Sequence, residues 1–148
     1  MSTPTFHDRA VSSFMRAQQL DEDLTYAINV GHTRAKIVSQ AQKASEYFLK
    51  AILFERGIRP GGTHELDITA RSQRTGLNDI WPDLAPLLDE YNQLYRQRNI
   101  ADYAHSDSPP VESYPGINEP EFTDHDVEWA LRIENSLKVL AERVVSLS

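Results

Sequence analysis

Residues 33–57 read TRAKIVSQAQKASEYFLKAILFERG, and this stretch decides the fold class. Small and apolar side chains recur along it in steps of three and four residues: Ala35, Val38, Ala41, Ser45, Phe48, Leu49, Ile52 and Leu53. This period places them on one face of an α-helix. Gly57 is the residue type that most often follows a last helical turn. The stretch therefore predicts a helix over 33–56 with one buried face.

Segments on both sides of this stretch show the same period. In 7–30, the inward positions are Ala10, Phe14, Ala17, Leu24 and Ile28, and Gly31 ends the segment. In 79–103, they are Leu84, Leu87, Leu88, Tyr91, Leu94 or Tyr95, and Ile100. Pro82 fits the first turn of that helix, and Pro86 is expected to kink it or delay its start.

A last amphipathic helix follows Thr123, which predicts an N-cap with acids in the first turn. Its apolar positions are Val127, Ala130, Leu131, Leu137, Leu140, Ala141 and Val144. Loops are expected at 58–64 and 106–122, with a short helix at 65–74. We therefore predict an all-α fold, four main helices and one short helix, as one domain over 1–148.

Composition narrows the function. The 148 residues include no cysteine, which excludes cysteine nucleophiles and cysteine-bound metals. The longest apolar run is 51–54, and the N-terminus lacks a secretory pattern, so we expect a cytoplasmic protein without a membrane partner. The net charge of −7 comes entirely from 101–148, so bulk nucleic-acid binding is not expected.

A local basic surface formed by residues 34–74 is still possible. Eight cations there outnumber four acids: Arg34, Lys36, Lys43, Lys50, Arg56, Arg59, Arg71 and Arg74 against Glu46, Glu55, Glu65 and Asp67. A solvated face of mixed charge is the favoured interpretation. No histidine has a Glu three residues before it, and no phosphate-loop motif is present, so we expect neither a metal nor a cofactor.

The candidate site is the run YRQRNIADYAH at 95–105. On a helix, Arg98 and Asp102 are four residues apart and His105 follows three later, so all three share one face. An imidazole can move a proton near neutral pH, and a guanidinium can hold a phosphate. Together they could cleave RNA without a metal. The alternative is a salt bridge and a histidine that meets the helix dipole.

Three features of the chain resemble the HEPN domain family (higher eukaryotes and prokaryotes nucleotide-binding). They are AQKASEYFLKAIL at 41–53 with the following RGI, THEL at 63–66, and Arg98-Asn99 through His105, which fits the family's R-x(4–6)-H motif. The resemblance implies a four-helix up-and-down bundle with one short extra helix. It also implies a homodimer that cleaves RNA at the interface without a metal. Arg98 would hold the phosphate, His105 would serve as acid or base, and Asn99 and Asp102 would support them.

The resemblance also implies partners. Many active members are toxins or defence proteins paired with a nucleotidyltransferase antitoxin, which in some pairs modifies a tyrosine; Tyr103 is the candidate here. The order Asp102-Tyr103-Ala104-His105 also resembles members that serve as non-catalytic binding modules, and this accessory role is the second hypothesis. A helical bundle with no nucleotide-related role is the third, and it predicts an exposed apolar patch.

Overall fold

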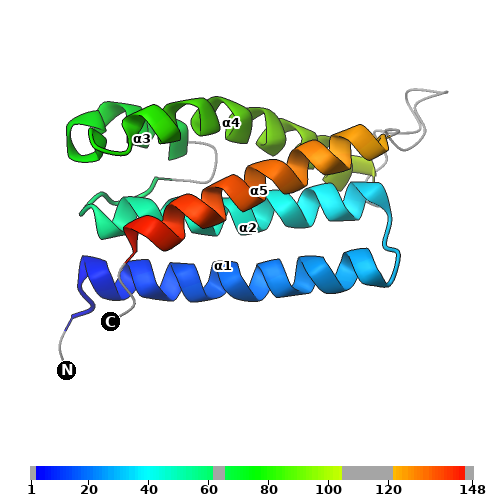
Figure 1. The fold of residues 1–148 in the computed structure, drawn as a ribbon, viewed down its shortest axis with the longest axis horizontal. Helices are drawn as coiled ribbons and strands as arrows, with labels where there is room; N and C mark the ends of the chain where they lie inside the picture. The colour runs from blue at the N-terminus through cyan, green and yellow to red at the C-terminus, as the bar shows by residue number, and fades with distance from the viewer. Residues whose placement is uncertain (1–2, 62–65, 105–121, 146–148) are drawn as a thin grey trace.

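The computed structural model describes residues 3–61, 66–104 and 122–145, without the side chains of 98–104. Within these ranges the chain forms helices and no strands (Figure 1). They are α1 Phe6–Asn29, α2 Arg34–Glu55, α3 Leu66–Ser72, the 3₁₀ turn η2 Arg74–Leu77, α4 Trp81–Ala104 and α5 Asp124–Val144. The four long helices alternate in direction along the bundle. The predicted all-α, up-and-down fold is confirmed.

Threonine N-caps begin three of the four long helices, at Thr5, Thr33 and Thr123. The Thr5 side chain accepts a hydrogen bond from the Asp8 backbone N–H at 3.0 Å, and the Asp8 carboxylate accepts one from the Thr5 N–H at 2.9 Å. Thr123 and Asp126 form the same reciprocal pair at the start of α5. Each capping box satisfies N–H groups that have no partner within the helix. The N-cap expected at Thr123 is therefore confirmed.

Two glycines end α1 and α2. Gly31 and Gly57 adopt φ angles of +77° and +73°, in the left-handed region. A side chain is strained there, so glycine allows the chain to leave the helix at these points. Both stops were expected from the sequence.

Pro86 lies inside α4, which already begins at Trp81. The expectation that Pro86 would delay the start of this helix is therefore wrong. Proline removes the hydrogen bond to the carbonyl four residues earlier and crowds that carbonyl, here that of Pro82 in the first turn, where the chain has no earlier turn to disturb. Pro86 is exposed, so its ring displaces no core side chain.

Helix α2 is the centre of the core and packs against α1, α4 and α5. Thirteen of its 22 residues are buried, including every member of the face expected from the sequence. Phe48 meets Phe14 of α1 edge to face, with ring centroids 5.7 Å apart. The period of α2 thus organises the whole bundle.

One core assignment is wrong. In α1, Ile28 is 41% exposed, whereas Ala27 is buried. Helix α5 crosses the bundle obliquely and lies farther from α1 at this end (Figure 1). Only the side of α1 toward α2 is covered there, so the buried stripe shifts by one residue.

No helix in the described ranges is both long enough and apolar enough to cross a bilayer.

Candidate functional site

The predicted motif lies at the C-terminal end of α4. Arg98, Asn99, Asp102 and Tyr103 belong to the last two turns of this helix, which continues to Ala104. Their side chains are outside the described part of the structure, and so are His105 and the 106–122 loop. Helix α4 thus provides the regular spacing on which the motif depends. The meeting of Arg98, Asp102 and His105 stays a prediction.

Two helix N-termini lie at the end of the bundle where α4 finishes. Helices α2 and α5 both begin there (Figure 1). Arg34 Nε donates to Asp124 Oδ1 at 2.8 Å and joins these two starts. The first turn of α2 contains no acid. Unpaired N–H groups give such helix starts a partial positive charge, which favours anions nearby.

Polar contacts fix α4 against α2 and α3. Gln42 Nε2 donates to the Tyr91 hydroxyl at 3.1 Å in the buried interface of α2 and α4. Asn92 Nδ2 donates to Asp67 Oδ2 at 2.6 Å, which joins α4 to α3. Leu66 at the start of α3 is fully buried, whereas the rest of the THEL element lies outside the described residues. These contacts set the register of the helix that carries the motif.

Acids neutralise half of the eight cations singled out in the sequence. Ion pairs hold Arg34, Lys50, Arg56 and Arg71. Arg56 donates two hydrogen bonds to Asp79, at 2.6 and 2.9 Å, and these lower the pKa of the Asp79 carboxyl. Much of the surface is therefore of mixed charge, as expected. Lys36 and Lys43 differ, because neither has an ion-pair partner among the described side chains.

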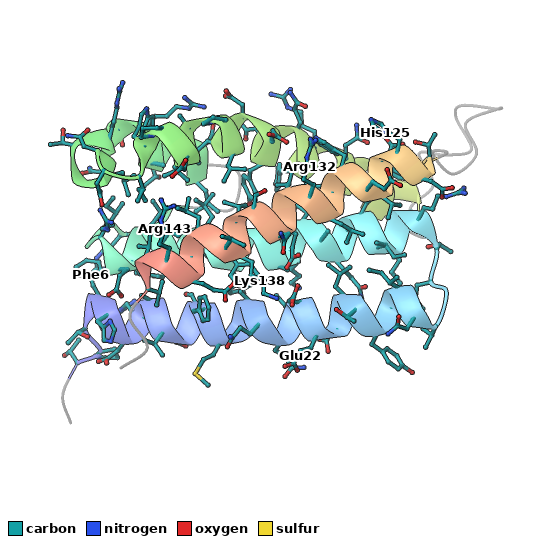
Figure 2. All side chains as sticks on the ribbon, in the orientation of Figure 1. Phe6, Glu22, His125, Arg132, Lys138 and Arg143 are labelled. Carbon is teal, nitrogen blue, oxygen red and sulfur yellow. The ribbon has the colours of Figure 1, made fainter. Side chains whose placement is uncertain are left out.

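A buried acid between α1 and α5 was missed by the sequence reasoning. Glu134 is only 4% exposed, and burial together with the neighbouring Asp21 carboxylate raises its pKa to about 8. Glu134 is therefore protonated near neutral pH and hydrogen-bonds to Asp21. Lys138 Nζ also donates to Asp21, at 2.9 Å, on the side of α5 that faces α1 (Figure 2).

A sequence signal for this cluster existed. Glu134 lies three or four residues from Ala130, Leu137 and Lys138, in the register of the buried face of α5. An acid in that register predicts a partner within the core. The cluster joins α1 to α5 and contains none of the predicted site residues, so we assign it to the architecture.

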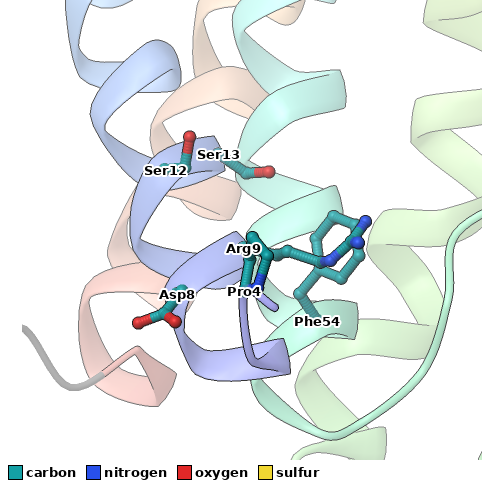
Figure 3. A pocket seen from close by; sticks show the side chains of 6 residues that line it. All are labelled: Pro4, Asp8, Arg9, Ser12, Ser13 and Phe54. Atoms are coloured by element: carbon teal, nitrogen blue, oxygen red, sulfur yellow. The ribbon is translucent and has the colours of Figure 1, made fainter. Parts of the chain in front are cut away.

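Two of the surface hollows are lined entirely by described residues. One, of about 530 Å³, lies where the start of α1 meets Phe54 of α2, and Arg9 extends across it toward that ring (Figure 3). The other, of about 480 Å³, lies between α4 and α5 and is lined by residues that include Pro86, Leu87, Val139 and Arg143. Neither is lined by the motif residues.

Within the described ranges, no group of three or more His, Asp or Glu side chains could hold a metal ion. His105 is outside this part of the chain, so the expected absence of a metal stays a prediction.

Comparison with known proteins gives one family. The model of the HEPN domain matches residues 12–142. No curated protein and no solved structure gives a match. The matched region includes α2, α3 and α4 completely, together with α1 from residue 12 and α5 up to residue 142, and the helical architecture agrees with it. The chain therefore belongs to the HEPN domain family.

Proposed function

We propose that this protein is a metal-independent endoribonuclease of HEPN type, acting as a toxin or defence component in the cytoplasm. The observation that carries the proposal is the Arg98…His105 motif at the end of α4 in a chain of this family. In that role, His105 removes the proton of a ribose 2′-hydroxyl and the 2′-oxygen attacks the adjacent phosphorus. The bond from phosphorus to the 5′-oxygen breaks, and that oxygen leaves with a proton taken up from water. Arg98 binds the phosphate and stabilises the charge that develops on it.

Three further assignments belong to this proposal. Asn99 and Asp102 orient the guanidinium and the imidazole. Two chains pair so that their motifs share one cleft, which makes the active species a homodimer. A nucleotidyltransferase antitoxin silences it by modifying Tyr103.

The test is RNA cleavage in excess EDTA. We expect the parent protein to produce a 2′,3′-cyclic phosphate, because the 2′-oxygen is the nucleophile. His105→Ala should lower the rate by roughly a hundredfold or more, which is the typical contribution of a positioned acid–base group. His7→Ala is the matched control, because His7 lies in the first turn of α1, at the end of the bundle opposite to the motif. Cleavage that survives in His105→Ala contradicts the assignment.

The homodimer has its own test. Light scattering of the parent protein should give twice the chain mass of 16.8 kDa. A monomer that cleaves RNA at full rate contradicts the shared cleft.

The order Asp102-Tyr103-Ala104-His105 supports a second candidate, a non-catalytic module that binds a nucleotidyltransferase. Folded dimeric protein that cleaves none of several RNAs favours this role over catalysis. The intact mass of protein from its native host, compared with that of Tyr103→Phe, then tests the modification.

A further inference from the structure

The exposed residues of α2 are all cations, and two of them, Lys36 and Lys43, lie on its outward side. Only Arg34, Lys36 and Lys43 are exposed among its 22 residues. Arg34 is held by Asp124 at the start of α5. Lys36 and Lys43 have no ion-pair partner among the described residues. The outward side of α2 thus carries two exposed cations that no described acid neutralises.

Aromatic rings lie between these cations. Lys36, Lys43 and Lys50 follow one another at seven-residue spacing, so they lie on one side of the helix about 10 Å apart. Tyr47 and Phe54 share that side, and both are half-buried. Lys50 Nζ lies 4.9 Å from the centre of the Tyr47 ring, and Glu46 holds it at 3.2 Å. We refer to Lys36, Lys43, Tyr47, Lys50 and Phe54 as the α2 stripe.

One end of the α2 stripe opens into the hollow beside α1. Phe54 lines this hollow of about 530 Å³ together with Arg9, Ser12 and Ser13 (Figure 3). The one acid there, Asp8, is engaged as the capping partner of Thr5. The hollow therefore offers one further cation, two hydroxyl groups and an aromatic ring, beside the Asp8 carboxylate, which keeps its negative charge because its hydrogen bonds with Thr5 lower its pKa.

The other end of the α2 stripe lies at the height of the predicted motif. Helices α2 and α4 run antiparallel, and their register is fixed by the contact of Gln42 with Tyr91. Lys36 is six residues before Gln42, and Gln97 is six residues after Tyr91. Because both helices rise by the same amount per residue, Lys36 lies level with the turn of α4 that carries Arg98.

We propose that the α2 stripe binds single-stranded RNA and leads it along α2 from the end of α4 to the hollow at Arg9. The identity of this ligand rests on the proposed ribonuclease function. Cations that follow a backbone and rings that stack on bases are the two elements of single-strand recognition. An acidic protein segment would use the lysines alone, whereas a nucleic acid can also contact the exposed parts of the Tyr47 and Phe54 rings, which pack against Lys50 and Phe6.

The experiment measures binding of a fluorescent 2′-O-methyl oligouridine to the full-length protein. This probe lacks the 2′-hydroxyl, so it reports binding without cleavage. Lys36→Glu/Lys43→Glu should weaken binding at least tenfold at low salt. It should also reduce the slope of log K against log salt by about 1.4, because each lost phosphate contact accounts for about 0.7 with single strands.

The control is Arg132→Glu/Arg143→Glu on α5 (Figure 2). Both side chains are exposed, and each pairs only with an exposed or half-buried acid of α4. The control thus lowers the net charge by the same four units at little cost in stability. We expect its affinity to stay within about twofold of the parent, and circular dichroism should show that both variants are folded.

Three outcomes overturn the proposal: no binding by the parent, equal weakening in both variants, or equal affinity of the parent for polyglutamate. The last would identify an acidic protein segment as the ligand. The outcome is separable from that of the ribonuclease test. If the parent cleaves RNA and Lys36→Glu/Lys43→Glu binds the probe as tightly as the parent, only the binding role of the α2 stripe is contradicted. If binding depends on the α2 stripe but the parent does not cleave RNA, only the ribonuclease function is contradicted.

Discussion

The inner and outer sides of α2 differ in burial and in charge. The inner side is packed with buried small and aliphatic residues and with Phe48, and it includes a few buried polar residues such as Gln42 and Ser45. The outer side exposes only cations, with half-buried rings between them. Buried apolar area stabilises the fold, whereas exposed charge contributes little to stability and can instead attract a ligand. One helix thus separates a structural face from a candidate binding face.

The largest expected loss of stability comes from a substitution on the inner side of α2. Phe48→Ala removes a buried ring that meets Phe14 across the α1–α2 interface. We expect the free energy of unfolding to fall by about 3–5 kcal/mol, measured by urea denaturation. Tyr26→Ala is the matched control, because Tyr26 is 65% exposed on α1. A loss below about 1 kcal/mol for Phe48→Ala would contradict the central role of α2.

The second effect concerns the buried acid of α5. The folded-state pKa of Glu134 is about 8, well above the usual value of 4.5. Between these two values, the unfolded chain releases this proton while the folded chain retains it. This contribution to stability is therefore fully present below pH 4.5 and is lost as the pH rises toward 8, by at most about 1.4 kcal/mol per pH unit.

Glu134→Gln tests that sign. The amide can still donate to Asp21 but does not titrate, so this variant should lose less stability than the parent from pH 5 to pH 8. The measurement is urea denaturation across that range. Glu128→Gln removes an exposed acid of the same helix and should leave the parental slope unchanged. Parallel profiles for the parent and Glu134→Gln would contradict the raised pKa.

A smaller effect is expected where α2 ends. Gly57 has φ +73° and nothing within 4 Å of an added Cβ, so Gly57→Ala isolates backbone strain. We expect a loss of about 1 kcal/mol in thermal denaturation. Gly76→Ala is the control: its φ is not in the left-handed region, and the added Cβ would meet Ile58 at an ordinary 3.9 Å. Equal melting temperatures for both variants would argue against strain at Gly57.

The smallest effect on stability should come from the outer side. Lys43→Ala removes an exposed cation with no ion-pair partner in the described ranges, so the free energy of unfolding should change by less than about 0.5 kcal/mol. Binding of the 2′-O-methyl oligouridine should nevertheless weaken severalfold. A variant that loses stability but keeps its affinity would reverse the division between the two sides of α2.

Local chemistry explains what could be predicted. The period of α2, the capping residues at Thr123 and the stops at Gly31 and Gly57 depend on residues close together in the chain, so each was found without the tertiary structure. The burial of Ala27 in place of Ile28 depends on the oblique path of α5, which no local sequence pattern indicates. The convergence of Arg98 and His105 stays a prediction.

The sequence by itself determined the helices, their ends and the placement of the motif at the end of α4, because propensity, period and capping act over a few residues. Only the tertiary structure decided which charges remain free. Acids distant in the chain neutralise Arg34, Arg56 and Arg71, whereas Lys36 and Lys43 face no acid among the described residues. It also placed Glu134 against Asp21, because the packing of α5 beside α1 excludes water from that carboxyl.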